Sequence, residues 1–481
     1  MDDPRRADGR RERILILSAG VGSGHNSAAA ALREACADRS DVEAVEVLDV
    51  LEVGSALYRD LLGKGYFVLV DGAPWIVSLG YDLSDQPFKR RGPVDPWTRA
   101  NAMPSLRRLR AFRPTAVICT HFLPAQLIAS LLLRGALDAR CAIVTTDFDF
   151  QGLWLASAFH RLFLAREESR VQLAEWGVPV DRLGVTGIPV RPQPADAPPA
   201  DAGAASMLLV SAGAAGGDYA LAAVHQIMRM RSPLRAVIVC GRNEDLRREV
   251  ETLTAGDDRF TVLGFTDRIP QLLREAALFI GKPGGLSASE CMAAGLPMVL
   301  VNPIPGQEVR NGDYLIEEGA AVRCATTTTL GWKVDRILSE PGRLARMRER
   351  AAAIGRPQAA PDVLEELLTG PAAPLVITRG AQKGLLEVSE QHRTAADLRG
   401  DEALVRLVRT DSDETLALVR GDELSELRAW LGGGGGGGDG DGDGDIALDR
   451  RGVDRIGQHW GARRIAERLL GDEASLVLRI R

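Results

Sequence analysis

The chain has 481 residues, hydrophobic residues make up 45% of it and charged residues 26%. These values are ordinary for a globular protein and allow about three domains of roughly 150 residues. The net charge of −6 is unusual for a nucleic-acid-binding protein, so we expect no nucleic-acid partner. Apolar runs never reach about 18 residues and the N-terminus is charged, which predicts neither a transmembrane helix nor a secretory signal.

The first half of the chain alternates apolar, strand-like runs with helical stretches. The helical stretch at 27–39 follows the first of these runs. The strand-like runs lie at 13–18, 42–49, 115–119, 141–146 and 161–165. This alternation predicts a parallel sheet covered by helices on both faces.

A Pro- and Ala-rich stretch at 191–205 predicts a linker, after which the same pattern restarts. The second set of strand-like runs lies at 207–211, 235–240, 260–263, 278–280 and 298–301. We therefore predict two doubly wound, Rossmann-like α/β domains, residues 1–190 and 191–371, that face a cleft in the GT-B arrangement. Ligands bind at the carboxyl ends of the strands in such folds. Dehydrogenases and some epimerases also pair such domains, so this fold does not decide the function.

Residues 372–481 have a different pattern and predict a small C-terminal α+β domain. We expect a hairpin formed by 403–409 and 415–419, a helix at 453–470 and a last strand at 474–480. A Gly- and Asp-rich insertion near 432–445 has the composition of a disordered segment. Part of it matches the start of a calcium loop, but Arg450 stands where a bidentate Glu is needed, so we do not expect calcium binding.

The glycine-rich turn GVGSGH follows the first strand and opens a helix. Gly22 and Gly24 leave the backbone free for a tight turn, and His25 falls at the helix N-terminus. The helix dipole there disfavours imidazolium, so His25 can accept a proton as a general base. Asp147, at a strand end in TTDF, is a second candidate base. Simple helix capping is the alternative for His25, and the turn lacks the third glycine of a dinucleotide fingerprint.

Three polar motifs follow strands of the second domain. The turn SAGAAGG contains Gly213 and Gly216 and suits a diphosphate at a helix N-terminus. The motif KPGGLSASE runs from Lys282 to Glu290, whose carboxylate can accept both hydroxyls of a ribose. The loop NPIPGQEVRN follows the next strand and carries amide and carboxylate groups that suit sugar hydroxyls.

Six segments, taken in order, carry a family resemblance. They are SAGVGSGHNSAAAAL, LDVL, TDF, VTGIPV, KPGGLSASE and PIPGQEVRN, and they lie within residues 12–370. Together they resemble the monogalactosyldiacylglycerol synthase and processive diacylglycerol glucosyltransferase group of glycosyltransferase family 28. That group is related to the peptidoglycan N-acetylglucosaminyltransferase. The resemblance implies an inverting GT-B transferase that needs no metal or other cofactor and moves a hexose from UDP-glucose or UDP-galactose to a diacylglycerol-like lipid.

Carried over by position, the resemblance implies a role for each motif. Glu290 would bind the ribose, and Phe265 would lie by the uracil. His25 would lie near the acceptor hydroxyl as the first candidate base, with Asp147 as the second candidate or as its partner. The residues implied near the phosphates are Lys282, Gly284, Gly285 and Ser287, and those implied to hold the hexose are Gln307 and Glu308.

The resemblance also implies that the first domain meets the membrane. Residues 56–83 mix apolar and aromatic side chains, among which Trp75 and Tyr81 suit a lipid interface. Basic clusters lie at 5–13, 89–91 and 107–113, and such clusters can dock on anionic headgroups. We therefore expect a peripheral protein on the cytoplasmic side of a membrane.

One departure and two alternatives stay open. Gln151 stands where members of the group usually have a histidine, which puts the identity of the acceptor in question. The sequence also fits a UDP-N-acetylglucosamine transferase that acts on another lipid-linked acceptor, or an inactive UDP-sugar sensor. Asp147-Phe-Asp149 resembles a metal-binding DxD motif, but it lies in the first domain, so we expect no metal there.

Overall fold

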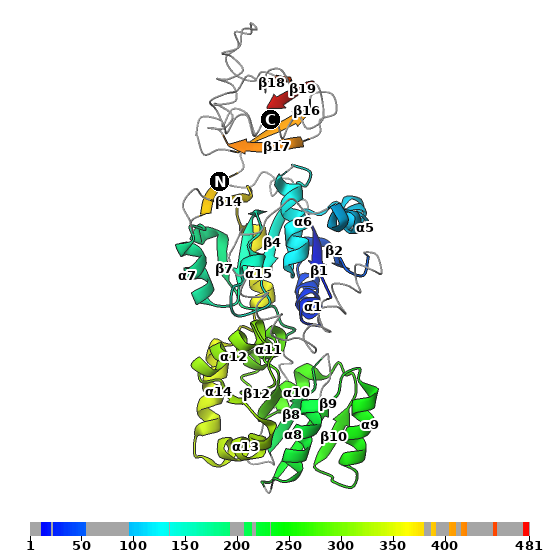
Figure 1. Cartoon of the computed structure of the whole chain (residues 1–481), viewed down its shortest axis with the longest axis vertical. Helices are drawn as coiled ribbons and strands as arrows, with labels where there is room; N and C mark the ends of the chain where they lie inside the picture. The colour runs from blue at the N-terminus through cyan, green and yellow to red at the C-terminus, as the bar shows by residue number, and fades with distance from the viewer. Residues whose placement is uncertain are drawn as a thin grey trace.

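The structure is a computed structural model of the whole chain (Figure 1). It describes residues 11–20, 23–53, 96–133, 135–192, 206–213, 218–230, 232–379, 386–390, 404–409, 415–420, 446–449 and 475–480. Gly22, Gly216, Trp75 and Tyr81, and the helix expected at 453–470, lie outside these residues.

The first domain is built on a parallel six-stranded sheet in the order β2-β1-β3-β4-β6-β7. Its strands are β1 Glu12–Ser18, β2 Val42–Asp49, β3 Ala116–Cys119, β4 Arg140–Val144, β6 Arg161–Leu164 and β7 Leu183–Val185. Its helices are α1 Ser23–Ala37, α5 Pro96–Phe112, α6 Phe122–Leu133 and α7 Glu167–Glu175, with short 3-10 turns η2 Gly152–Trp154 and η3 Val180–Arg182.

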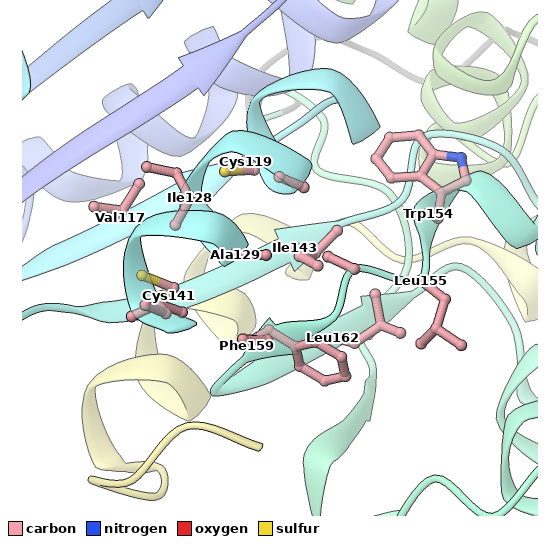
Figure 2. Close-up of a cluster of buried hydrophobic side chains, with 14 of the residues drawn as sticks. Val117, Cys119, Ile128, Ala129, Cys141, Ile143, Trp154, Leu155, Phe159 and Leu162 are labelled. Carbon is pink, nitrogen blue, oxygen red and sulfur yellow. The ribbon is translucent and has the colours of Figure 1, made fainter. Parts of the chain in front are cut away.

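Alternate residues of each central strand enter different cores, as the period of a strand requires. In β1, Ile14 and Ile16 pack under α1, whereas Leu15 and Leu17 pack on the opposite face under α6. Figure 2 shows the second of these cores, in which Trp154 lies at one end of the apolar cluster. Both faces of the sheet are therefore covered, as the apolar strands predicted.

The second domain repeats this plan with the strand order β10-β9-β8-β11-β12-β13, again all parallel. The strands are β8 Ser206–Ser211, β9 Leu234–Val239, β10 Phe260–Leu263, β11 Leu278–Gly281, β12 Met298–Val301 and β13 Ala321–Cys324. The helices are α8 Asp218–Met228, α9 Glu244–Leu253, α10 Ile269–Glu275, α11 Gly285–Ala293, α12 Gln307–Glu317, α13 Leu330–Ser339 and α14 Arg343–Ile354, with the 3-10 turn η4 Thr327–Thr329. Both predicted doubly wound domains are thus confirmed.

After α14 the chain returns to the first domain (Figure 1). Helix α15 Ala359–Thr369 buries its apolar face under the first sheet, and Arg39 of the first domain forms an ion pair with Glu365 at 3.0 Å. Strand β14 Leu375–Arg379 then pairs antiparallel with β5 Ala158–Phe159. The chain thus returns to the first domain before residue 371, where the sequence pattern placed the end of the second domain. The sequence did not predict this return, because the amphipathic pattern of α15 does not reveal which sheet the helix covers.

The remaining strands are antiparallel. Strand β15 Leu386–Glu390 pairs with β14, and β16 Leu404–Arg409, β17 Thr415–Arg420, β18 Ile446–Asp449 and β19 Ser475–Ile480 form a separate sheet. Strands β16 and β17 pair as the predicted hairpin, which confirms that expectation. In Figure 1 this sheet lies at the end of the molecule away from the second domain.

Candidate active site

The candidate site lies where the carboxyl ends of the two sheets face each other. In each sheet the strand order reverses at one point, between β1 and β3 in the first and between β8 and β11 in the second. Loops that leave adjacent strands in opposite directions open a crevice at such a point. The turn with His25 follows β1, and the motif KPGGLSASE follows β11, so the two strongest motifs occupy these two crevices.

His25 is half-buried in the first turn of α1 and is fixed by two neighbours. Its Nδ1 lies 3.0 Å from the carbonyl oxygen of Thr120 and 2.9 Å from Oγ1 of Thr146. Since a carbonyl only accepts, the proton of the neutral ring is on Nδ1, and the lone pair is on Nε2. In this tautomer Nε2 can accept a proton from an acceptor hydroxyl.

The protonation state of His25 is set by its surroundings. Burial lowers its pKa from 6.5 to about 4, against smaller raising effects of the hydrogen bond to Thr120 and of Asp49. The ring is therefore neutral at physiological pH, as the sequence predicted. The sequence argument relied on the helix dipole, whereas in the structure burial of the ring is the main cause.

Aromatic rings line the site beside His25. The ring of His121 meets that of His25 edge-on at 4.5 Å, and Trp154 lies 6.2 Å from both. His121 is also neutral, because its Nδ1 accepts from the backbone N–H of Leu123 at 3.0 Å and burial lowers its pKa well below the usual value. Gln151 accepts from the N–H of Leu153 at 2.9 Å, so it caps the turn that carries Trp154.

Asp147 contacts the second domain and not His25. Its Oδ1 accepts from Nδ2 of Asn311 at 3.1 Å, and Asn311 belongs to α12. Burial raises the pKa of Asp147 to about 6, the bond from Asn311 lowers it, and Glu308 and Asp149 raise it. The partners of His25 are Thr120 and Thr146, so Asp147 remains a candidate base of its own but does not orient His25.

Asp149 lies between two guanidinium groups. Arg166 of the first domain binds its Oδ1 at 2.9 Å, and Arg310 of the second domain binds its Oδ2 at 2.8 Å. Both oxygens of this carboxylate thus already have cationic partners. The DxD-like pair is thus used for contacts between the two domains.

The N-terminus of α11 packs directly against the first domain. A β-carbon built on Gly285 would lie 1.8 Å from the carbonyl oxygen of Thr146, and one built on Gly24 would lie 3.5 Å from Cδ2 of Leu286. Only glycine allows the approach at Gly285. Gly24, predicted on the acceptor side, therefore faces the donor domain, and the helix end predicted to hold phosphates lies beside the loop of Thr146.

Ser287 and Glu290 lie half-buried in α11, two and five residues beyond Gly285. Burial raises the pKa of Glu290 to about 7, while the charge of Arg191 lowers it. A carboxyl group that titrates near neutral pH inside a cleft is a common feature of binding and catalytic sites. The carboxyl group predicted to bind ribose thus lies in α11 within reach of the charge of Arg191.

Glu308 lies beside the predicted phosphate loop. Its Oε2 accepts from the backbone N–H of Ile304 at 2.7 Å, and a β-carbon on Gly284 would lie 3.5 Å from its Oε1. Burial raises its pKa, and Lys282 lowers it. Gln307 begins α12 immediately before Glu308, so both predicted hexose-binding residues lie at the helix N-terminus.

The remaining described donor residues lie at the same edge of the second sheet. Phe265 is 71% exposed and has the guanidinium of Arg242 5.0 Å from its ring centroid. Nζ of Lys282 lies 5.6 Å from the ring of Tyr219, and Gly213 has a positive φ of 73° after β8. An exposed aromatic ring that can stack on a base fits the position implied for uracil.

Sequence reasoning missed four residues that build this site: Thr120, Thr146, Arg310 and Asn311. Thr146 stands in the motif TTDF, Arg310 and Asn311 end the motif PIPGQEVRN, and Thr120 directly precedes His121. Gln307 and Asn311 are four residues apart and therefore lie on one face of a helix. This spacing is a sequence signal that could have pointed to Asn311 as a site residue. The carbonyl that holds His25 belongs to Thr120, which directly follows β3 and lies 95 residues away in the sequence, and no sequence pattern reports such a contact.

Comparisons with known proteins agree with this arrangement. Residues 25–190 match the family of monogalactosyldiacylglycerol (MGDG) synthase, and residues 212–354 match glycosyl transferases group 1. Relatives named processive diacylglycerol beta-glucosyltransferase, from Bacillus mycoides (strain KBAB4) and Bacillus cereus (strain AH187), are 27% and 26% identical to this chain. Each alignment covers 75% of this chain and 94% of the relative.

The S. aureus MnaA–UDP co-structure is 13% identical, has a TM-score of 0.50 and aligns 74% of this chain with 96% of its own. At this identity it shows a shared fold only. The relatives do not favour the N-acetylglucosamine transferase or the inactive sensor as alternatives. The chain therefore has a GT-B fold and is similar to the MGDG synthases, to glycosyl transferases group 1 and to the processive diacylglycerol glucosyltransferases.

Proposed function

We propose that this protein transfers a hexose from UDP-glucose or UDP-galactose to the hydroxyl of a diacylglycerol-like lipid. The observation that carries the proposal is the geometry of His25, a neutral histidine with its proton on Nδ1 and its Nε2 lone pair available at the carboxyl edge of the first sheet. The names of the curated relatives, which describe diacylglycerol glucosyltransferases, support the choice of acceptor.

The reaction is a single displacement. Nε2 of His25 takes the proton of the acceptor hydroxyl while that oxygen attacks the anomeric carbon from the face opposite UDP. The bond from the anomeric carbon to the phosphate oxygen breaks, UDP leaves with the bonding electrons, and the configuration inverts. Lys282 and the N–H groups at the start of α11 stabilise the charge on the departing diphosphate, which makes a metal ion unnecessary in this scheme.

A peripheral position at an anionic membrane surface completes the proposal. Among the described residues, no helix combines the length and the apolar character that a membrane crossing demands. Helix α5 and the residue after it present exposed arginines, namely Arg107, Arg108, Arg110 and Arg113. A basic surface of this kind attracts acidic headgroups. The cytoplasmic side follows from the donor, since UDP-sugars are made in the cytoplasm.

The experiment that tests the function measures UDP release from UDP-glucose, UDP-galactose and UDP-N-acetylglucosamine, each with and without diacylglycerol vesicles. Release with one hexose donor that depends on the vesicles, and that His25→Ala abolishes, is the expected result. Product analysis by mass spectrometry identifies the glycolipid. Vesicle-independent release, or release only with UDP-N-acetylglucosamine, would contradict the proposed acceptor or the proposed donor respectively.

A further inference from the structure

Helix α12 joins the sugar-binding end of the donor domain to the Asp147 loop of the acceptor domain. Its first turn carries Gln307 and Glu308, and the next turn carries Arg310 and Asn311. Gln307 and Asn311 are four residues apart, so they lie on one face of the helix. A rigid helix therefore connects the two groups of residues.

Asn311 is fully buried, at 0% exposure, and both ends of its amide bind the other domain. Its Oδ1 accepts from the backbone N–H of Phe148 at 2.8 Å, and its Nδ2 donates to Oδ1 of Asp147 at 3.1 Å. An asparagine is suited to this place because one planar group supplies a donor and an acceptor side by side. Truncation would leave a buried N–H and a buried carboxyl group without these partners.

The neighbours of Asn311 strengthen the same contact. Arg310 binds Asp149 at 2.8 Å, and the ring of Tyr314 lies 5.0 Å from that of Phe148. Phe148 itself is 5% exposed and belongs to the apolar core of the second domain, although it comes from the first. The loop 147–149 is thus held by the second domain through hydrogen bonds, an ion pair and apolar packing.

We propose that Asn311 is a positioning residue, which fixes the carboxylate of Asp147 relative to Gln307 and Glu308 when the two domains are closed. The inference rests on the proposed function, because it assumes that the start of α12 holds the transferred hexose. It adds that donor binding and the arrangement of the acceptor side are linked through a single helix. Asp147, the second candidate base, is then oriented by a residue of the donor domain, and in this proposal the acid limb of the kcat profile reports its ionisation.

The proposed role of Asn311 predicts that its removal changes the pH dependence of kcat. The groups that face Asp147 are Asn311 and Glu308 from α12 and Asp149 from its own loop, and Asn311 is the one among them that lowers its pKa. Removal of Asn311 leaves burial and the two carboxylates, all of which raise that pKa above about 6. The acid limb of the kcat profile should therefore move to higher pH.

The test compares Asn311→Ala with Asn243→Ala in the full-length enzyme. Asn243 is a matched control, because its Oδ1 also accepts one backbone N–H, from Leu246 at 3.0 Å, but it caps α9 within the second domain. For Asn311→Ala we expect kcat to fall at least about tenfold, the UDP-glucose KM to change less than about threefold, and the acid limb to rise, since a group lost from the transition state alone lowers kcat and not KM. Asn243→Ala should keep kcat and the acid limb.

A readout independent of activity separates the inference from the proposed function. The amide hydrogen of Phe148 bonds to Asn311, so hydrogen exchange of the peptide spanning 145–150 should accelerate in Asn311→Ala and not in Asn243→Ala. Unchanged exchange, or an unchanged kcat and acid limb in an active enzyme, would overturn the positioning role. Absence of UDP release by the wild type, with exchange altered as expected, would instead refute the proposed function and leave the contact in place.

Discussion

Gly285 and Thr146 belong to different domains, yet a β-carbon on Gly285 would lie 1.8 Å from the Thr146 carbonyl oxygen and 2.9 Å from its carbonyl carbon. The side chain of the same Thr146 contacts His25, with its Oγ1 2.9 Å from Nδ1 of the ring. The helix predicted to bind the diphosphate and the histidine predicted to act as base are thus joined through one threonine. The distance between the start of α11 and His25 is therefore set by how closely α11 can approach the backbone of Thr146.

Gly285→Ala should therefore lower activity by holding the domains apart. Real β-carbons do not lie at 1.8 Å from backbone atoms, and the atoms in the way are backbone that cannot rotate aside. Because the obstructing atoms all belong to the first domain, we expect kcat to fall at least about tenfold while the melting temperature changes little. Steady-state kinetics and thermal melts check this. An alanine variant with wild-type kcat would show that the contact is not needed in the cycle.

The sequence predicted the two sheets well because buried parallel strands are continuous apolar runs. Strands 42–49, 260–263 and 298–301 have the predicted limits. Strand β13 was missed, since its sequence AVRC contains an arginine and lies at the edge of the sheet. The return of α15 to the first domain was missed as well, because an apolar helical face does not specify its partner.

The candidate site was predicted in part for a similar reason. Motifs at strand ends gave His25, Asp147 and Glu290, because local chemistry marks them. The bonds of Asn311 to Asp147 and Phe148 join residues more than 160 positions apart, and they depend on how two domains pack. Such contacts exist only in three dimensions.

His25 should make stability sensitive to acid. Its pKa is 6.5 in the unfolded chain and about 4 in the folded one, so between these values the unfolded state binds the extra proton. The contribution is fully present above pH 6.5 and is lost as the pH falls towards 4. Asp147 and Glu290, whose pKa values are raised, act in the opposite direction, so the comparison must be with a variant.

The suitable variant is His25→Asn, whose amide can still donate to Thr120 but which has no group that titrates. Between pH 7 and 4.5 the urea midpoint should fall further for the wild type than for this variant.

The same substitution, His25→Asn, should lower kcat by about 10²–10⁴-fold, the usual contribution of a general base. If the urea midpoints of the wild type and the variant fell equally between pH 7 and 4.5, His25 would not be buried in its neutral form. A variant that kept the wild-type kcat would point to Asp147 as the base.

Glu290 should make donor binding depend on pH. Its pKa of about 7 means that the carboxylate, which accepts ribose hydroxyls best, becomes predominant only above neutral pH. The affinity for UDP-glucose, which has no phosphate group that titrates near pH 7, should therefore rise from pH 6 to 8. Calorimetry with Glu290→Gln should give weaker binding without this slope.

Arg191 provides the control for this prediction, since its charge lowers the pKa of Glu290. In Arg191→Gln the midpoint of the binding curve should move to higher pH. A slope that persists in Glu290→Gln would assign the titration to another group and would remove the support for a ribose-binding carboxylate.

The basic surface of α5 should govern binding to acidic vesicles. Arg107, Arg110 and Arg113 are exposed, and each basic residue near an anionic surface contributes about 1 kcal/mol, so replacing all three with glutamine should weaken binding on the order of a hundredfold at low salt. Arg108→Gln is the control, because Glu46 already pairs with that arginine at 2.7 Å and its loss should matter less. Vesicle sedimentation measures both, with UDP-glucose affinity expected to stay constant. Equal binding by the triple variant and the wild type would exclude α5 as the membrane contact and leave the segment before it as the remaining candidate.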